Sequence, residues 1–156
     1  MKVLIVCTGN TCRSPLAAAL LTHIRARREA RDVLVSSAGT GAWQGAPASE
    51  GAYLVGLEHG LDLSAHRARQ LTGQLVADAD LILTMSRSHR QRAIDMGAGD
   101  RVHVLGEYSG LPGTDAEVPD PYGGELAEYR ATYERLERLL AAVADRLERE
   151  RAGGDR

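Results

Sequence analysis

The sequence has few cysteines, no long apolar run and almost no net charge, and each shortage excludes a class of protein. Only Cys7 and Cys12 occur, too few and too close together for the disulfide framework of a secreted fold. They favour a reducing compartment, and we expect a cytoplasmic protein. The apolar run at residues 3–6 is far too short for a signal peptide or a membrane span. A net charge of -2 gives no whole-chain attraction to nucleic acid or to an anionic membrane.

What is present is the composition of an ordinary folded chain. The 156 residues are 44% hydrophobic and 26% charged, which suits one domain able to bury a sizeable core. We find no repeat and no linker, so we expect a single domain over residues 1–150 and a flexible tail over residues 151–156. The last helical stretch shows no exposed apolar seam, which favours a monomer.

Apolar runs alternate with helix-like stretches along the chain. The runs lie at residues 2–6, 32–36, 80–85 and 101–105. This alternation predicts a single-domain α/β fold, a four-stranded parallel sheet flanked by helices on both faces. Helices are expected from Ser14 as N-cap with Pro15 at the first position, over residues 48–58, after Thr72, from Ser86 through residue 94, and from about Glu125. The glycine-rich stretch at 106–124 is long for a loop, which favours a functional one.

The first strand runs directly into the segment Cys7-Thr8-Gly9-Asn10-Thr11-Cys12-Arg13-Ser14, here named the Cys7 loop. Its thiol follows a strand and faces a helix N-terminus, the place where parallel sheets bind ligands. Unpaired amides there favour anions, Gly9 lets the backbone curl, and the same field stabilises a thiolate. Arg13 offers a planar fork for two phosphoryl oxygens, and Ser14 can donate to the sulfur. We therefore predict a nucleophilic Cys7 in a phosphate-binding loop whose other members are Thr8, Gly9, Asn10, Thr11, Cys12 and Ser14.

Residues 6–15 resemble the signature of the low-molecular-weight protein tyrosine phosphatase family. The resemblance continues at Ser37-Ala38-Gly39, Trp43, residues 63–71 and Asp120-Pro121-Tyr122, so it spans nearly the whole chain. It implies a flavodoxin-like fold, no metal, no cofactor and a phosphocysteine intermediate. The implied partners are phosphorylated proteins, with inorganic phosphate as the product.

The resemblance also implies a role for individual residues. Cys7 would attack phosphorus, Arg13 would bind the phosphoryl oxygens, and Asp120 would protonate the leaving group and then activate water. Asp115 and Glu117 are alternative acids that lack the Asp-Pro-Tyr context. Ser37 and His66 match the family residues that hold the loop asparagine. The four remaining histidines, His23, His59, His89 and His103, are interpreted as surface or packing residues.

Substrate choice is predicted from two departures from the tyrosine-specific pattern. Thr11 stands where those members usually carry a bulky aliphatic residue, and Gly123 where they carry a second aromatic. A threonine hydroxyl suits a polar guanidinium better than an aryl ring, and with residues 120–124 the chain resembles the protein arginine phosphatase branch. Thr11, Trp43 and Tyr122 would form the substrate pocket. The alternative is a tyrosine phosphatase. In that case Thr11 is a neutral variation and Gly123 is only a turn residue before the last helix.

Two further readings and one regulatory hypothesis remain open. One alternative function is an arsenate reductase, but those of this fold need additional cysteines for a disulfide relay, and this chain has none beyond Cys12. The other is a catalytically silent phosphate-binding module, which would need neither Cys7 nor Asp120. A disulfide between Cys7 and Cys12 is geometrically feasible, which predicts reversible oxidative inactivation; otherwise Cys12 is a packing residue. The basic helix with Arg87, His89, Arg90 and Arg92 could contact acidic partners, but it is interpreted as a solvated face.

Overall fold

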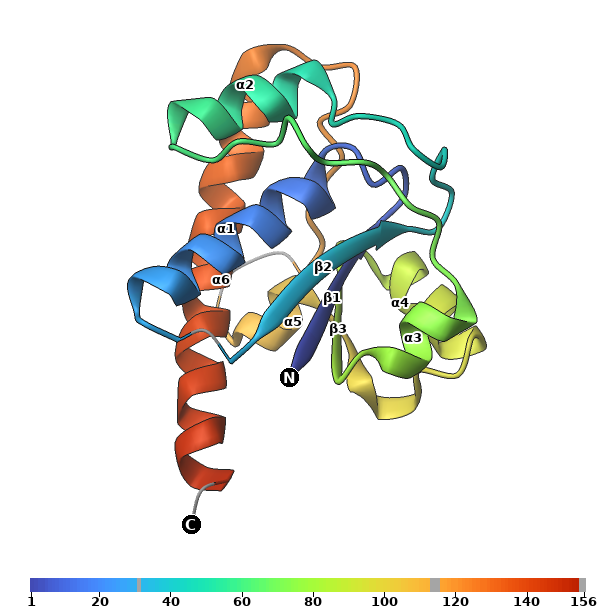
Figure 1. The fold of residues 1–156 in the computed structure, drawn as a ribbon, viewed down its shortest axis with the longest axis vertical. Helices are drawn as coiled ribbons and strands as arrows, with labels where there is room; N and C mark the ends of the chain where they lie inside the picture. Colours follow the sequence, from blue (N-terminus) through green and yellow to red (C-terminus); the bar gives the residue numbers. More distant parts are fainter. Residues whose placement is uncertain (31, 113–115, 155–156) are drawn as a thin grey trace.

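Each of the four apolar runs forms one strand, and the strands pair in parallel in the order β2-β1-β3-β4. Figure 1 shows the first three side by side. The computed structural model describes residues 1–30, 32–112 and 116–154. The strands are β1 (Lys2–Cys7), β2 (Leu34–Gly39), β3 (Leu81–Thr84) and β4 (Val102–Val104). The predicted fold class is therefore confirmed. After β1 the chain moves to β2 on one side and then to β3 on the other, so β1 ends at a topological switch point.

Successive side chains of β1 enter two different cores, as the two-residue period of a strand requires. Val3 and Ile5 belong to the larger core, and Leu4 and Val6 to the smaller one. All four are at most 2% exposed, because helices cover both faces of the sheet. Burial on both faces explains why this run is continuously apolar instead of alternating.

Helices pack on both faces of the sheet, with the longest ones on the larger core (Figure 1). The helices on the larger core are α1 (Arg13–Arg27), α2 (Glu50–Glu58), α5 (Leu105–Ser109) and α6 (Leu126–Gly154). Those on the smaller core are α3 (Gly73–Asp78) and α4 (Arg87–Asp95), and a short 3-10 turn, Gly99–Arg101, precedes β4. None of these helices combines the length and apolarity that a membrane crossing requires.

Three helix starts carry the expected kind of cap, and one does not. Thr72 and Ser86 cap α3 and α4 as predicted, and Ser49 caps α2, which begins at Glu50 instead of residue 48. The prediction for Ser14 is wrong: α1 begins at Arg13, and Ser14 is its second residue. The Ser14 hydroxyl is used by the Cys7 loop instead of by the helix backbone.

The boundaries of two other segments also differ from expectation. Helix α6 continues through Gly154, so the helix includes residues 151–154 that were assigned to a tail, and residues 155–156 lie outside the described part. Arg151 forms an ion pair with Asp32 at 2.5 Å, which gives the helix end a partner near the start of β2. The stretch at 106–124 is not all loop, because α5 occupies its beginning.

Candidate active site

The Cys7 loop leaves the carboxyl end of β1 and joins the N-terminus of α1, as predicted. The loop after β2 packs directly on it: Thr40 and Gly41 donate backbone N–H groups to the carbonyls of Cys7 and Thr8, both at 2.9 Å. A Cβ at Gly39 would lie 2.3 Å from the Thr8 carbonyl oxygen. Glycine is therefore required at the end of β2 so that the two loops can touch.

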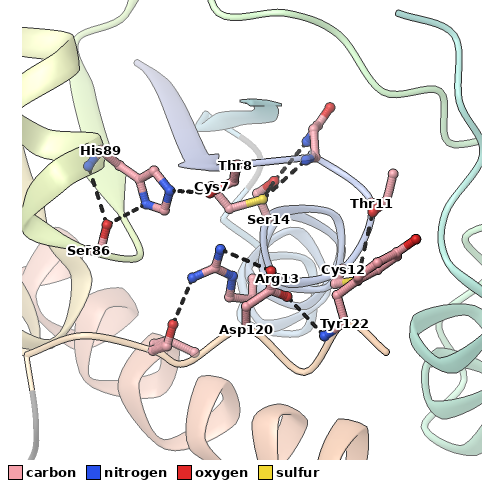
Figure 2. Close-up of polar contacts among 12 residues, drawn as sticks. Cys7, Thr8, Thr11, Cys12, Arg13, Ser14, Ser86, His89, Asp120 and Tyr122 are labelled. Carbon is pink, nitrogen blue, oxygen red and sulfur yellow. Dashed lines mark hydrogen bonds and ion pairs between the residues drawn. The ribbon is translucent and has the colours of Figure 1, made fainter. Parts of the chain in front are cut away.

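The Cys7 sulfur is buried and surrounded by donors. Cys7 is 2% exposed, and its Sγ accepts the backbone N–H of Asn10 at 3.3 Å. The Ser14 Oγ lies 2.9 Å from the same sulfur (Figure 2). Because Asn10 Nδ2 already donates to Ser14 Oγ at 2.8 Å, the Ser14 proton is directed toward the sulfur. Both groups stabilise a negative charge on sulfur.

Asn10 holds the shape of the loop. Its φ of +57° lies in the left-handed region, whereas Gly9, the residue expected to supply the curl, has no positive φ. Asparagine tolerates this region because its side chain can form local hydrogen bonds. Here the amide donates to Ser37 Oγ at 2.9 Å and accepts the backbone N–H of Arg69 at 2.9 Å. Three elements of the fold thus meet at one buried side chain.

His66 contacts the same residue through the backbone. Its Nε2 lies 2.6 Å from the Asn10 carbonyl oxygen. A carbonyl only accepts, so Nε2 carries the proton in this bond. Burial lowers the pKa of His66, with a smaller contribution from Arg67 and Arg69, although the bond to Asn10 opposes it. Ser37 and His66, the two residues expected to hold the loop asparagine, therefore both contact it.

Arg13 is a buried cation with an unused donor. It is 6% exposed, and its Nη1 donates to the Val118 carbonyl at 2.9 Å. Its Nη2 lies 3.7 Å from Asp120 Oδ2 (Figure 2). The buried Nε has no hydrogen-bond partner among the described residues. A buried donor of this kind is expected to be satisfied by a ligand or water.

Asp120 is brought to the Cys7 loop by the segment before α6. The backbone N–H of Tyr122 donates to its Oδ1 at 3.0 Å, which leaves Oδ2 facing Arg13. The Glu117 carboxylate is engaged elsewhere, accepting the backbone N–H of Arg87 at 2.7 Å. Asp115, the other alternative acid, lies outside the described residues. Of the described candidates, Asp120 is thus the carboxylate beside the arginine.

These groups line a cavity of about 360 Å³. Thr11 forms part of its wall, and Trp43 and Tyr122 stand at its edge with exposed fractions of 85% and 73%. The remaining lining residues are Cys7, Thr8, Gly9, Cys12, Arg13, Gly41, Ala46 and Asp120. Within the described ranges, no group of acidic, histidine and cysteine side chains is arranged to hold a metal ion.

Cys12 occupies the N-cap position of α1 that was expected for Ser14, but its side chain forms no capping hydrogen bond. Both cysteines are free thiols, and Cys12 Sγ contacts Ser49 Oγ at 3.0 Å and the Tyr129 hydroxyl at 3.8 Å. Burial raises the pKa of Tyr129, so its hydroxyl stays protonated near neutral pH. The Cys12 sulfur therefore contacts two hydroxyl groups, those of Ser49 and Tyr129, and Cys12 also lines the cavity.

His89 was missed as a site residue. It is 5% exposed, and its Nε2 lies 2.8 Å from Thr8 Oγ1 in the Cys7 loop (Figure 2). Its neighbours in the sequence offered a signal: Ser86 caps a helix directly after β3, the strand beside β1, which puts residue 89 near the Cys7 loop. The interpretation of α4 as wholly solvated is wrong at this position. His59 stacks on Tyr133, His103 packs against Tyr108 with the two rings tilted at 44°, and His23 is exposed.

Known proteins of one family match this chain over almost its full length. The profile of the family described as low molecular weight phosphotyrosine protein phosphatase matches residues 2–153. A protein-arginine-phosphatase of Geobacillus stearothermophilus is 38% identical, with 96% of this chain and 97% of that protein covered. The low molecular weight protein-tyrosine-phosphatase Wzb of Escherichia coli K12 has the same identity and the same coverage of both chains. Overall identity thus favours neither substrate.

A solved structure adds information on chemistry in a relative. It is a mutant of the arginine phosphatase YwlE in which a serine replaces the active-site cysteine and is phosphorylated. It superposes with a TM-score of 0.87 at 38% identity and covers 97% of this chain and 99% of its own. The relative therefore carries phosphorus on the side chain at its nucleophile position.

Proposed function

The chain belongs to the low molecular weight phosphotyrosine protein phosphatase family, and we propose that it hydrolyses phosphoarginine in proteins through a phosphocysteine intermediate. The observation that carries the proposal is one arrangement of three side chains. The Cys7 sulfur accepts the Asn10 N–H and faces the Ser14 hydroxyl, while Asp120 lies 3.7 Å from the buried Arg13 at the same cavity. A nucleophile, an anion-binding cation and an acid are thereby assembled for phosphoryl transfer.

In the first step the Cys7 thiolate attacks phosphorus and the bond from phosphorus to the leaving nitrogen breaks. The N–H groups of the Cys7 loop and the Arg13 guanidinium, including its unpartnered Nε, bind the three equatorial oxygens. Asp120 gives its proton to the leaving nitrogen. The product of this step is phosphocysteine, which agrees with the phosphorylated side chain in the YwlE mutant.

In the second step water attacks phosphocysteine, and the Asp120 carboxylate takes the proton of that water. Inorganic phosphate forms, and the Cys7 sulfur leaves as a thiolate. Ser14 stabilises this leaving group, because its proton points at the sulfur from 2.9 Å. The reaction needs no metal or other cofactor, and we propose that one chain acts alone, because Cys7, Arg13 and Asp120 line one cavity of a single chain.

Phosphoarginine is favoured over phosphotyrosine by Thr11 and Asp120. Among the described residues, the Thr11 hydroxyl contacts only the Cys12 sulfur, at 3.7 Å, so it is available to a substrate N–H. The Asp120 carboxylate can pair with a guanidinium in two places, which a phenol does not allow. Gly123 is weaker evidence for phosphoarginine than the sequence suggested. Its φ of +79° favours glycine at this turn whatever the substrate is.

Phosphotyrosine is the second candidate substrate, because two aromatic side chains stand at the edge of the cavity. Trp43 and Tyr122 are the two most exposed aromatic side chains at this site, and both can stack on a phenol ring. They can also stack on a guanidinium plane, so these residues alone do not separate the substrates. Two relatives at equal identity carry the two activities in their names.

We expect peptides of one sequence to be dephosphorylated faster at phosphoarginine than at phosphotyrosine, by at least about 100-fold in kcat/KM. Thr11→Ile should reduce this ratio by about tenfold or more, because it removes the hydroxyl and narrows the cavity. The matched control is Thr22→Ile on α1, whose hydroxyl bonds to the Ala18 carbonyl and lies outside the cavity.

Two results would redirect the assignment. Faster turnover of phosphotyrosine by the unmutated protein would make it a tyrosine phosphatase. Absence of any turnover, including that of para-nitrophenyl phosphate, with vanadate still bound, would identify a silent phosphate-binding module.

We also propose that Cys12 protects Cys7 in a reducing compartment such as the cytoplasm. Peroxide would convert the Cys7 thiolate to a sulfenic acid, and attack by Cys12 would release water and form a disulfide. Both thiols border the same cavity, which supports this step. We expect dithiothreitol to restore most of the activity of the oxidised protein but little of that of a Cys12→Ser variant. Equal recovery of the two proteins would contradict this protection.

A further inference from the structure

The His89 side chain bridges α4 and the Cys7 loop through both of its ring nitrogens. Nδ1 lies 2.8 Å from Ser86 Oγ, and Nε2 lies 2.8 Å from Thr8 Oγ1 (Figure 2). Thr8 follows the nucleophile directly and lines the cavity. The bridge therefore ends on the hydroxyl of a residue that lines the cavity, yet none of the catalytic roles above uses this hydroxyl.

Ser86 fixes the orientation of this ring. Its Oγ accepts the backbone N–H of His89 at 3.3 Å as the cap of α4, and it also lies 2.8 Å from Ser88 Oγ. If Ser88 donates its proton to Ser86, the proton of Ser86 is free to bond to Nδ1. The helix start and the ring are thus held by one hydroxyl.

The ring is neutral at ordinary pH. Burial lowers the pKa of His89 to about 4, helped by the positive charge of Arg13 and opposed by Glu117 and Asp120. A neutral imidazole has one donor and one acceptor, so its two bonds must run in the same direction along the chain of groups. Only two arrangements exist, and they differ in what the Thr8 hydroxyl offers to the cavity.

In the first arrangement Ser86 donates to Nδ1, Nε2–H donates to Thr8 Oγ1, and the Thr8 proton is free to point at an anion. In the second arrangement Thr8 donates to Nε2 and turns its lone pairs toward the anion. A phosphoryl group carries negative charge, so it stabilises the first arrangement and destabilises the second. The presence of the anion therefore selects the Nε2–H form.

We propose that His89 is a positioning residue that makes the Thr8 hydroxyl a hydrogen-bond donor to the phosphoryl group. The proposal rests on the proposed function, because it assigns Thr8 a bond to the group being transferred. Ser86, His89 and Thr8 then form a relay of three hydrogen bonds that ends at the substrate.

A double-mutant cycle tests whether His89 acts through Thr8. We expect Thr8→Val and His89→Leu each to raise the inhibition constant of inorganic phosphate and lower kcat/KM for para-nitrophenyl phosphate by about tenfold, the size expected for one hydrogen bond to a charged group. The double variant should be no worse than the poorer single variant. Multiplied effects, or unchanged phosphate inhibition in Thr8→Val, would overturn the proposal. Thr8 is exposed, so this variant also gives a result if His89→Leu does not fold.

Two amide variants of His89 distinguish a hydrogen-bonding role of its ring from a purely packing role. In His89→Gln the amide nitrogen is as many bonds from Cα as Nε2, so we expect it to restore phosphate inhibition at least in part. In His89→Asn the amide reaches only the position of Nδ1, so we expect no restoration. Equal behaviour of the two variants contradicts the relay. The matched control is His103→Gln, on the half-buried histidine of β4, which should leave phosphate inhibition unchanged.

Nitrogen NMR of the unmutated protein gives a direct readout. We expect the imidazole of His89 to be in the Nε2–H form when vanadate is bound, and an Nδ1–H form in that complex would overturn the inference. The outcome is separable from that of the proposed function. A protein that hydrolyses phosphoarginine but shows the Nδ1–H form retains its function and loses the relay, whereas one that lacks turnover loses the function first.

Discussion

A Cys7→Ser protein should turn over phosphoarginine peptides at least about 10⁴-fold more slowly than the unmutated protein, the scale seen when a covalent nucleophile is removed. The Asn10 N–H and the Ser14 hydroxyl stabilise a thiolate at this position. A serine hydroxyl stays protonated there, so these donors no longer activate it. Single-turnover assays with phosphoarginine peptides would measure the loss.

The matched control is Cys12→Ser, which makes the same atomic change in the same loop. Its sulfur contacts Ser49 and Tyr129, so we expect kcat within about tenfold of the unmutated value. An acid-quenched reaction of the unmutated protein should carry phosphorus on Cys7. Undiminished turnover in Cys7→Ser would remove the basis of the covalent mechanism.

Asp120→Asn should lower kcat for phosphoarginine by about 10²–10⁴-fold, the usual contribution of a general acid. The amide keeps the size of the side chain and can still accept the Tyr122 N–H, but it has no acidic proton to transfer. The loss should be smaller for para-nitrophenyl phosphate, because its leaving group is stable as an anion. Steady-state kinetics with both substrates separate the acid role from a binding role.

Glu117→Gln provides the comparison within the same segment. Its carboxylate accepts the backbone N–H of Arg87, so we expect kcat to change by no more than a few-fold. A large loss in Glu117→Gln together with little loss in Asp120→Asn would transfer the acid role to Glu117. Equal losses for both substrates in Asp120→Asn would instead assign Asp120 to binding.

The sequence predicted those features that depend on local patterns. Burial on both faces makes β1 continuously apolar, so its position and the class of the sheet could be read directly. The Cys7 loop was predictable for the same reason, because a strand, a glycine-containing turn and a helix start are contiguous. Ser86 was predictable as a cap because capping involves only neighbouring residues.

Features that depend on distant contacts were predicted less well. His89 looked like one member of a basic helix, and only the pairing of β3 with β1 brings its ring to Thr8. Ser14 looked like a helix cap, but Asn10 and Cys7 take its hydroxyl. Arg151 looked like part of a tail, although Asp32 lies within reach of it. For His89 and Arg151 a partner far away in the sequence outweighed the local preference, and for Ser14 the fold of its own loop did so.

The bonds of Asn10 to three separate parts of the fold have a consequence for selectivity. Ser14, Ser37 and the backbone of Arg69 hold the amide, so the Cys7 loop already has its anion-binding shape without a ligand. Free phosphate should then compete with substrate as an ordinary product inhibitor. Choice among target proteins then falls to the cavity edge, where Trp43 and Tyr122 present most of their surface to solvent. Recognition of the modification and recognition of the polypeptide that bears it are consequently separable, and each can change in evolution without disturbing the other.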